Sequence, residues 1–375
     1  MLEGKVRNVL FVYSFLAHPR GGIGQYELQI SQRLRQDPHI QLTLSKLGPI
    51  NIPRFLRKVF FLDLKAFADN NPIWYNVPSD KIFIVHLSHQ FMAISIPIIK
   101  VRGFFSRFVP KTIVTVHDLY DLETQWNPLL HNFHPVWKWS DGLVNYMMLK
   151  GIGLADHIIV DSNATKDSVL RVLPRVRHKI SVVYLGHDSS GDKTPETSVR
   201  NPRQVLYVGS LHPRKNVLTL VQAISLLREQ DYNVHLILAG ASRTKSIPNE
   251  IKNAEGVELL GEVTADQIRD LYRTSSLFAF PSLSEGFGLP LIEAMSHGCP
   301  VLASDIPVFR EVGQDAAVYV PPLNITDWAL TIKKILNDKS TLLNLSQKGV
   351  CRASQFQWNK TFTHTIHVYD QVMKR

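Results

Sequence analysis

The sequence predicts an α/β protein with two doubly wound domains, and three observations support this fold class. Short apolar runs alternate with stretches long enough for crossover helices, the pattern of a parallel sheet with helices on both faces. The alternation occurs twice, in residues 1–186 and again in residues 204–357. Between them, residues 187–203 are rich in Ser, Thr, Asp and Pro and almost free of large apolar side chains, as in a linker. A chain of 375 residues is long enough for each domain to bury its own core.

The predicted strands are short runs rich in Val, Ile, Leu and Phe. The first domain carries them at 8–15, 81–88, 111–117, 156–162 and 179–185. The second carries them at 204–210, 233–240, 256–263, 276–282, 300–305 and 317–322. At the end of the chain, residues 358–375 have the spacing of an amphipathic helix, with apolar side chains at Phe362, Ile366, Tyr369 and Val372.

Composition limits the class of protein. Hydrophobic residues make up 45% of the chain and charged residues 20%, as in soluble globular proteins, and two cysteines cannot form a disulfide framework. These features predict a cytoplasmic protein, and no secretory signal is expected because Val9–Leu16 is predicted as a strand. Residues 82–99 lack charged side chains, but their polar residues favour a buried strand followed by a helix over a membrane span. The formal charge of +10 favours anionic partners: nucleotide phosphates, acidic lipid or nucleic acid.

Residues 281–300, PSLSEGFGLPLIEAMSHGCP, are predicted to form a turn and a helix after the strand that ends near residue 280. Pro290 suits the first turn of that helix, and Gly298 suits its end. The turn would lie at the carboxyl end of a parallel strand, where open α/β sheets bind ligands.

Two glycines and two glutamates give this turn its predicted chemistry. Gly286 and Gly288 let the backbone approach a ligand, and the amides at the helix start can receive a phosphate. Glu285 would accept hydrogen bonds from sugar hydroxyls, and Glu293, in the first helical turn, from a ribose diol. The alternative is an ordinary turn with two solvated glutamates.

A second glycine-rich stretch, Pro19–Tyr26, follows the first predicted strand and precedes a helix. Gly22 and Gly24 suit a turn whose amides meet a diphosphate. The spacing is not the dinucleotide fingerprint G-x-G-x-x-G, and no acidic residue ends a second strand in the expected place. From the residues alone, a diphosphate-binding turn and a plain loop are both acceptable interpretations.

A basic pair follows the first strand of the second domain. In Val208–Asn216, VGSLHPRKN, Arg214 and Lys215 lie just before a helical stretch, where their charges would face phosphate oxygens. The alternative is a solvated basic turn, which is what most Arg-Lys pairs are.

Two strand ends of the first domain carry further polar candidates. His117 and Asp118 end one strand, although a histidine in such a place is more often structural. The carboxylates that follow, in D-L-Y-D-L-E, lack a convincing metal-ligand geometry. Ser162 is well placed to cap the helix that begins after it.

In chain order, these motifs resemble those of the retaining GT-B glycosyltransferases of family 4. The matching elements are GGIG in the first loop, His-Asp, G-x-x-x-x-R-K-N aligned from Gly209, and two glutamates that flank seven residues. The resemblance implies the GT-B architecture, with two Rossmann-like domains facing across a cleft that holds the active site, and a last helix that crosses back onto the first domain.

The resemblance also implies roles for individual residues. It assigns catalysis to Glu285, Arg214, Lys215 and His117. It assigns donor binding to Gly22, Gly24, Ser162, Gly209, Gly286, Phe287, Gly288, Leu289 and Glu293. It implies no cofactor and no metal, because the Arg-Lys pair would supply the positive charge that Mg²⁺ supplies elsewhere.

Two stretches of the first domain interleave cations with aromatic residues, Ile52–Phe67 and Lys100–Lys111. Each suits a helix whose aromatic face is core, and each equally suits a surface helix on an anionic bilayer or a lipid-diphosphate acceptor. In the second interpretation Arg102, Arg107 and Lys111 contact the acceptor or the membrane.

The motifs therefore predict a retaining hexosyltransferase that uses a nucleotide diphosphate sugar. GDP-mannose is the first expected donor, because the GGIG and His-Asp combination is similar to that of mannosyltransferases, and a UDP-hexose is the second. The expected acceptor is a glycan or a polyprenyl-diphosphate-linked glycan of surface polysaccharide or glycolipid synthesis, at the cytoplasmic face of the membrane. The alternatives are a nucleotide-sugar epimerase or phosphorylase of the same fold, or a basic membrane- or nucleic-acid-binding module without catalysis.

Overall fold

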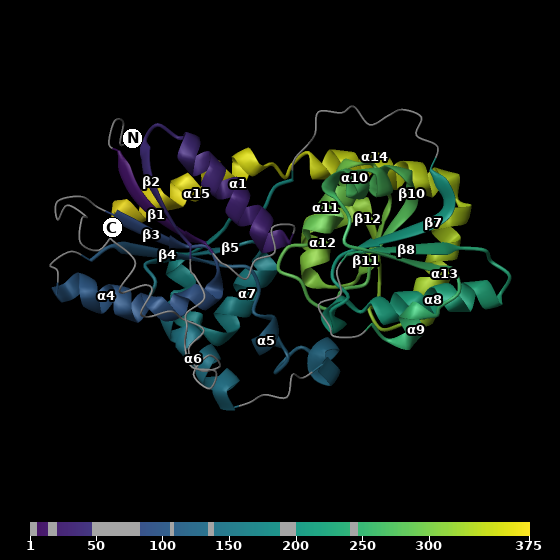
Figure 1. Ribbon diagram of the computed structural model, residues 1–375, viewed down its shortest axis with the longest axis horizontal. Coiled ribbons are helices and arrows are strands. Elements are labelled where there is room, and N and C mark those ends of the chain that lie inside the picture. The colour runs from purple at the N-terminus through teal and green to yellow at the C-terminus, as the bar shows by residue number, and fades with distance from the viewer. Residues whose placement is uncertain are drawn as a thin grey trace. The chain divides into compact units, whose positions relative to one another are not determined.

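The computed structural model describes residues 6–13, 21–46, 83–105, 109–133, 139–187, 200–240 and 247–375. The chain forms two compact units, and each contains a six-stranded parallel sheet with helices on its faces (Figure 1). Unit 1 comprises residues 1–122, 135–185 and 358–375, and unit 2 comprises residues 123–134 and 186–357. The predicted fold class, two Rossmann-like doubly wound domains, is confirmed.

The sheet of unit 1 has the strand order β2-β1-β3-β4-β5-β6, with neighbouring strands parallel. Its strands are β1 (Arg7–Tyr13), β2 (Ile40–Lys46), β3 (Phe83–Leu87), β4 (Lys111–Val116), β5 (His157–Val160) and β6 (Ile180–Val182). Strand β2 is missing from the prediction. It lies at the edge of the sheet, where its side chains are only partly buried and its apolar signal is correspondingly weak.

The helices of unit 1 alternate with these strands, as the crossover rule for parallel sheets requires. They are α1 (Gly22–Gln36), α4 (Ile96–Phe105), α6 (Trp139–Leu154), α7 (Asn163–Val172) and α15 (Trp358–Met373), and the short helix α5 (Tyr120–Glu123) ends where the chain passes into unit 2. Residues 82–99 form β3, a 3₁₀ turn and the start of α4, as predicted. Among the described residues, no helix is long and apolar enough to cross a membrane.

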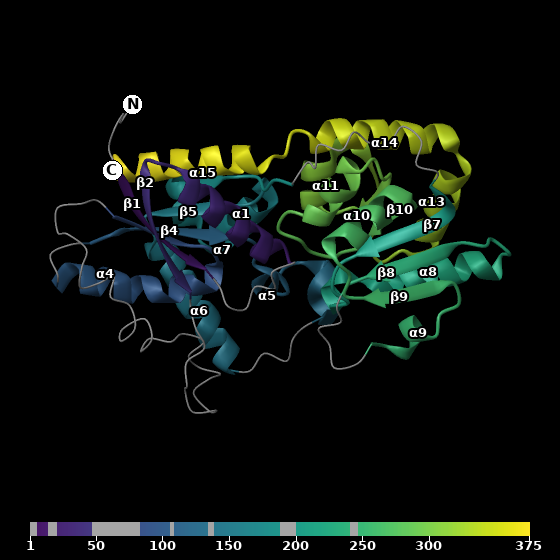
Figure 2. The ribbon, with the colours of Figure 1, turned by 45° about the horizontal axis from the view of Figure 1, so that its top comes forward.

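The C-terminal helix α15 belongs to unit 1 and lies beside α1 (Figure 2). Arg7 forms an ion pair with Asp370 at 2.7 Å, and the buried hydroxyl of Tyr369 lies 2.6 Å from His86 Nδ1. Phe362 and Ile366, which the spacing placed on the buried face, are only half-buried. Thr361 is buried instead, because its hydroxyl donates to the Tyr184 carbonyl at 2.8 Å.

The sheet of unit 2 has the order β12-β11-β10-β7-β8-β9. Its strands are β7 (Asn201–Val208), β8 (His235–Ala239), β9 (Val257–Gly261), β10 (Ser275–Phe280), β11 (Val301–Ser304) and β12 (Ala317–Val320). Its helices are α8 (Val217–Glu229), α9 (Asn249–Lys252), α10 (Ala265–Thr274), α11 (Leu289–Ser296), α12 (Pro307–Gly313), α13 (Ile325–Asn337) and α14 (Lys339–Ala353). Strand β7 begins at Asn201, within the stretch predicted as linker.

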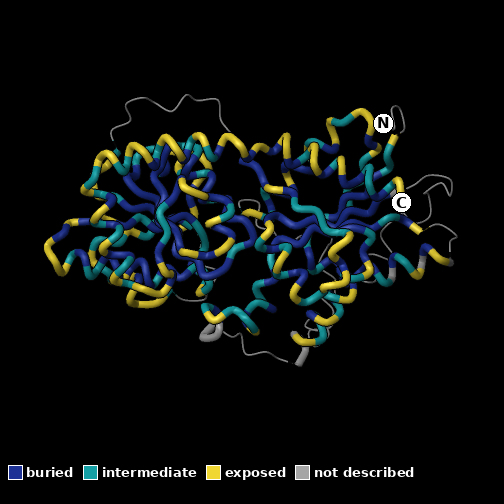
Figure 3. Tube along the Cα trace, turned by 180° about the vertical axis from the view of Figure 1, so that it is seen from behind, coloured by how far each residue is buried: buried dark blue, intermediate teal, exposed yellow. Residues whose placement is uncertain are grey.

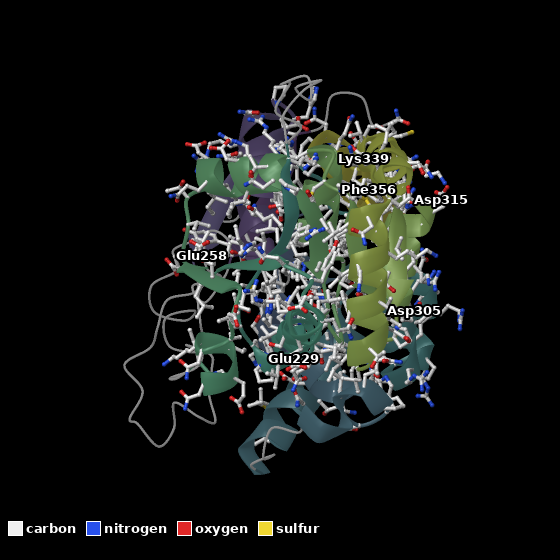
Figure 4. The ribbon with its side chains drawn as sticks, turned by 90° about the vertical axis from the view of Figure 1, so that its right-hand side faces the viewer. Glu229, Glu258, Asp305, Asp315, Lys339 and Phe356 are labelled. Carbon is white, nitrogen blue, oxygen red and sulfur yellow. The ribbon has the colours of Figure 1, made fainter. Side chains whose placement is uncertain are left out.

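Burial separates the interior of each unit from its periphery. The central strands are buried along their length, and in β10 every residue is buried (Figure 3). Figure 4 labels Asp305, Asp315 and Lys339 at the periphery of unit 2, where Asp305 pairs with Arg310 at 2.7 Å. Because the central strands are buried on both faces, the loops at their carboxyl ends are where polar functional groups can be placed.

Candidate functional site

The turn between β10 and α11 has the local structure that its residues predict. Gly288 has a φ of +92°, and a Cβ built there would lie 2.9 Å from the Phe309 ring, so the position requires glycine. Pro290 lies in the first turn of α11, and Gly298, with a φ of +66°, follows the helix end. Glu293 is the fifth residue of α11, so it lies about one residue beyond the first helical turn, where it was expected.

Within this turn, Glu285 accepts two hydrogen bonds on Oε1. One comes from Lys215 Nζ and forms an ion pair, and the other comes from Ser282 Oγ at 2.8 Å. The Lys215 and Glu285 side chains are 13% and 9% exposed. The structure therefore brings two predicted catalytic residues, 70 positions apart in sequence, into direct contact at the carboxyl ends of neighbouring strands β7 and β10.

Backbone and side-chain hydrogen bonds hold the Arg-Lys turn against the turn after β10. The Leu283 N–H donates to the Arg214 carbonyl at 2.9 Å. Asn216 adopts left-handed backbone angles, with a φ of 53°, and its amide donates to the carbonyls of Pro281 at 3.1 Å and Pro322 at 2.8 Å. An asparagine suits this position because it tolerates the left-handed region better than most residues.

Gly209 ends β7 in a crowded place. Its N–H donates to the Ala239 carbonyl at 2.9 Å, and its φ is +152°. A Cβ there would lie 2.7 Å from the hydroxyl of Tyr207. Burial, followed by the nearby charge of Glu285, raises the pKa of Tyr207 well above its usual value, so this hydroxyl stays protonated and donates to the Ser210 carbonyl at 2.7 Å.

Glu293 lies in a separate group on α11. The hydroxyl of Tyr272, on α10, donates to Glu293 Oε2 at 3.3 Å. The ring of Tyr272 stacks on His297, which ends α11, with the ring centroids 5.8 Å apart. The Glu293 carboxylate therefore accepts from the Tyr272 hydroxyl, whereas Glu285 pairs with Lys215.

Phe287 and Leu289 are buried within unit 2. The Phe287 ring contacts the ring of Phe356 edge to face, at 5.6 Å between centroids. Gly286, the other predicted donor-binding residue of this turn, is also buried. The side chains of Phe287 and Leu289 thus pack in the core and support the turn.

In unit 1, His117 is 5% exposed and both of its ring nitrogens have partners. Nδ1 lies 2.6 Å from Asp161 Oδ2, and Nε2 lies 2.9 Å from the Ser88 carbonyl oxygen. Burial by itself would lower the pKa of His117, but the Asp161 carboxylate outweighs burial and raises it. Both ring nitrogens therefore face acceptor oxygens, which holds the His117 side chain within the ends of β3, β4 and β5.

A second buried group adjoins His117. The Ser88 hydroxyl donates to Glu27 Oε1 at 2.6 Å, and the ring of Tyr26 lies edge to face on His117 at 5.0 Å. The His117 N–H donates to Gln90 Oε1 at 3.2 Å, and Gln90 Nε2 donates to the Asp118 carbonyl at 2.8 Å. These contacts fix the His-Asp turn.

The glycine-rich stretch and Ser162 both start helices in unit 1. Gly22 and Gly24 lie in the first turn of α1, and the Gln25 N–H makes the first intrahelical bond, to the Gly21 carbonyl at 2.9 Å. The first backbone N–H groups of a helix have no acceptor within the helix, so they can bind an anion. Ser162 Oγ accepts from the Thr165 N–H at 3.0 Å, which confirms its predicted helix-capping role.

The basic-aromatic stretches are described only in part. Ile52–Phe67 and Arg107 lie outside the described residues, as does the side chain of Arg102. Lys111 begins β4 and is half-buried. On α4, Phe104 is 75% exposed, so this ring lies at the surface of unit 1.

Sequence reasoning missed the partners that hold the predicted residues in place. Asn216 and Ser282 lie within the quoted motifs, and Asp161 directly precedes Ser162, but no role was predicted for them, so position in or next to a motif was the available signal. Within the described ranges, no three His, Cys, Asp or Glu side chains are arranged to hold a metal ion.

Comparison with known proteins places both halves of the chain in one family. The profile of "Glycosyl transferases group 1" matches residues 191–350, and that of "Glycosyltransferase Family 4" matches residues 20–191. The chain is 28% identical over 233 residues to O-antigen chain mannosyltransferase RfbU of Salmonella typhimurium, covering 60% of this chain and 65% of that protein. It is 35% identical over 170 residues to O-antigen chain mannosyltransferase B of Escherichia coli, covering 44% of this chain and 45% of that protein. The aligned regions thus span less than two thirds of these curated relatives.

Solved structures share the fold at low sequence identity. Sucrose-phosphate synthase from Thermosynechococcus elongatus has a TM-score of 0.74 at 20% identity, covering 98% of this chain and 99% of that chain. The Anabaena protein Alr3699/HepE, solved in complex with UDP and glucose, has a TM-score of 0.71 at 18% identity, covering 96% and 99%. With both profiles matched in succession along residues 20–350, the chain belongs to the family 4 glycosyltransferases, with the GT-B fold.

Proposed function

We propose that the chain is a retaining hexosyltransferase that moves a sugar from a nucleotide diphosphate donor to a glycan or lipid-linked acceptor in surface polysaccharide or glycolipid synthesis. GDP-mannose is the first candidate donor, because the two relatives above are named as O-antigen mannosyltransferases. A UDP-hexose is the second, supported by the Anabaena neighbour solved with UDP and glucose.

The observation that carries this proposal is the Lys215–Glu285 ion pair, at the ends of two adjacent strands. Its two charges match the two parts of the donor. A lysine ammonium suits the diphosphate, and a carboxylate suits the hydroxyls of the transferred sugar. In the free chain the two charges neutralise each other, so donor binding would divert Lys215 to phosphate oxygens and leave Glu285 to accept from the sugar.

In the proposed reaction, the bond between the anomeric carbon and the diphosphate oxygen breaks, and its electron pair leaves with the nucleotide. Arg214 and Lys215 stabilise the negative charge that develops there, the kind of electrostatic effect that contributes most in many enzymes. The acceptor hydroxyl forms the new bond to the same carbon and passes its proton to the departing diphosphate oxygen. Both ring nitrogens of His117 are bonded to Asp161 and Ser88, so His117 is proposed to position the His-Asp turn rather than to offer a free ring nitrogen.

Glu293 is proposed to bind the nucleoside. Its carboxylate accepts a hydrogen bond from the Tyr272 hydroxyl, which helps to position it, and a carboxylate suits the two hydroxyls of a ribose. The glycines of the β10–α11 turn and of the α1 start are proposed to bring backbone amides to the donor phosphates. No cofactor is needed in this scheme, and its independence of metal ions stays a prediction.

The test begins with a panel of GDP, UDP, GDP-mannose, UDP-glucose and related sugars in a thermal-shift measurement. A donor present at a hundred times its Kd should raise the free energy of unfolding by about 2.7 kcal/mol. Nucleotide release and sugar transfer are then measured with the donor that binds, with and without EDTA, and the anomeric configuration of the product is determined by NMR. A chain that binds none of these compounds and releases no nucleotide contradicts the proposal and favours a non-catalytic module.

A further inference from the structure

Residues 123–134 join unit 2 although they lie within the first half of the sequence. They follow the His-Asp motif and contain η2 (Pro128–Phe133), a 3₁₀ helix that lies against η4 (Pro213–Lys215), which carries Arg214 and Lys215. In Figures 1 and 2 the blue helical turn of these residues lies beside the green ribbons of unit 2. The segment therefore contacts the turn that carries the predicted diphosphate-binding pair.

A short hydrogen bond connects this segment to the turn after β10. The hydroxyl of Ser284, which is 5% exposed, donates to Glu123 Oε2 at 2.6 Å. A hydroxyl bound to a carboxylate at this distance makes a charge-assisted hydrogen bond, about twice as strong as a neutral one. Ser284 directly precedes Glu285 in the chain, so the bond acts next to a predicted catalytic residue.

Both ends of this contact are fixed by other bonds. The Glu123 carbonyl accepts from the N–H groups of Trp126 at 3.0 Å and Asn127 at 2.8 Å, which holds the backbone of the segment. On the other side, the Leu283 N–H donates to the Arg214 carbonyl at 2.9 Å. The Ser284–Glu123 bond thus joins two segments that are each already ordered, and little conformational entropy is left to lose when it forms.

We propose that Glu123 is a positioning residue for Glu285, a role that rests on the proposed function. Its carboxylate holds Ser284 and thereby fixes the backbone that presents Glu285 to the transferred sugar. In this role Glu123 acts through Ser284 rather than by touching the sugar. Without the Glu123 carboxylate, the Ser284–Glu285 backbone loses the hydrogen bond that ties it to the 123–134 segment. A displacement of about 1 Å at a reacting group can cost about 10²-fold in rate, which sets the expected scale.

The test compares four variants with the wild-type chain. Glu123→Ala and Ser284→Ala each remove the bond, and the double variant completes a thermodynamic cycle. Glu123→Gln is the conservative variant, because its amide oxygen can still accept from Ser284. Gln125→Ala changes an exposed side chain of the same segment and serves as the matched control. For each protein we measure kcat, the donor KM, the Kd of GDP and UDP by calorimetry, and urea unfolding.

Glu123→Ala and Ser284→Ala should each lower kcat by about 10- to 100-fold, and the double variant should lose no more than either single variant. The donor KM and the nucleotide Kd should stay near wild type, and Glu123→Gln should recover most of kcat. The two alanine substitutions should also be coupled in urea unfolding, which is measured whether or not the chain is active.

Two results would overturn the inference. The first is a kcat of Glu123→Ala equal to that of Gln125→Ala. The second is that Glu123→Ala weakens kcat, donor affinity, nucleotide binding and melting temperature in parallel, which would indicate a structural role. A wild-type chain that transfers nothing contradicts the proposed function and the positioning role with it. An active wild type without coupling between Glu123 and Ser284 contradicts the positioning role alone.

Discussion

Lys215 and Glu285 form an ion pair in which both side chains are mostly shielded from water. Removing one partner of such a pair leaves an uncompensated charge, so each substitution affects stability as well as chemistry. A loss of activity in a single variant therefore has two sources, and the experiments need to separate them.

The first prediction separates these sources with the Arg-Lys pair. Replacing Arg214 and Lys215 by alanine should lower the transfer rate by about 10²–10³, because both stabilise the leaving diphosphate. Lys215→Ala alone should also lower the free energy of unfolding, and adding Glu285→Gln should recover stability but not rate. Urea unfolding and steady-state kinetics measure the two effects, with the exposed Lys339→Ala as control. A folded and fully active double alanine variant would remove both residues from the mechanism.

The second prediction concerns the two glutamates of the family motif. Glu285→Gln keeps the side-chain volume but weakens acceptance from sugar hydroxyls, so it should lower kcat strongly and nucleotide affinity only modestly. Glu293→Gln should weaken nucleotide binding itself. Calorimetric titration with the free nucleotide, alongside kcat, distinguishes the two profiles. If both variants gave the same profile, the division of roles between sugar and ribose would be wrong.

At the scale of elements, Asn216 joins three segments of unit 2. Its left-handed backbone starts α8, and its amide bonds to carbonyls at the ends of β10 and after β12. Together with the Leu283–Arg214 backbone bond, this buried side chain fixes the Arg-Lys turn beside the turn after β10.

The third prediction follows from this arrangement. Asn216→Gly keeps the left-handed backbone but loses the side-chain bonds, and should cost about 1–3 kcal/mol of stability, since two buried carbonyls lose a donor. Asn216→Asp places a carboxylate against the same two carbonyl oxygens and should cost more. Urea unfolding measures both, with Asp231→Gly as the control at an exposed position with a similar φ of 57°. Equal costs for the glycine and aspartate variants would contradict the proposed contact.

At the scale of the whole molecule, buried histidines govern the response to acid. Burial lowers the pKa of His86 to about 3 and that of His157 to about 4, so both are neutral in the folded chain. In the unfolded chain a histidine titrates near pH 6.5. Their contribution to stability is therefore present above about pH 6.5 and is lost as the pH falls toward 4. The contribution of His117 to stability has the opposite pH dependence. Because its pKa is raised in the folded state, this contribution is present at low pH and is lost as the pH rises.

The fourth prediction is that the free energy of unfolding falls between pH 6.5 and pH 4. Each histidine that protonates only on unfolding contributes a slope of up to about 1.4 kcal/mol per pH unit. His157→Gln should reduce the slope by up to one proton, whereas Gln125→Ala, which removes no titratable group, should leave it unchanged. Urea unfolding across this range supplies the slopes, and an unchanged slope in His157→Gln would show that His157 does not contribute.

Unit 1 also exposes apolar side chains next to basic residues. Val101, Phe104 and Val109 are 56%, 75% and 46% exposed, and Lys111 follows them at the start of β4. This combination is typical of a surface that contacts an anionic membrane.

The fifth prediction is that the chain binds anionic vesicles and that salt weakens the binding. Each Lys or Arg near such a surface contributes about 1 kcal/mol, which fades over a Debye length. Replacing Arg102, Arg107 and Lys111 by serine, or Phe104 by serine, should release the protein, while replacing Lys333, Lys334 and Lys339 in unit 2 should not. Co-sedimentation with anionic and neutral vesicles at low salt is the assay. Equal and negligible binding to both would favour a soluble acceptor.

The strands could be predicted from the sequence because central strands of a parallel sheet are buried on both faces and must be continuously apolar. The same reasoning failed for β2, an edge strand that needs no such run. The turn after β10 was predictable because Gly288 and Pro290 restrict the backbone locally, whatever the chain does elsewhere. Glu293 lies about one residue beyond the first turn of α11, because helix ends cannot be fixed from sequence to within a residue or two.

By itself, the sequence determined the fold class, the glycine turns and the residue types that suit a nucleotide sugar, because these depend on local backbone preference and on apolar periodicity. Only the tertiary structure decided which charges meet. Lys215 reaches Glu285 across 70 residues, and Ser284 reaches Glu123 across 161. His117 is likewise occupied by Asp161 and Ser88, so its ring nitrogens serve the protein rather than a ligand. Contacts of this kind arise when the carboxyl ends of parallel strands come together at one edge of a sheet, and no local pattern in the chain specifies them.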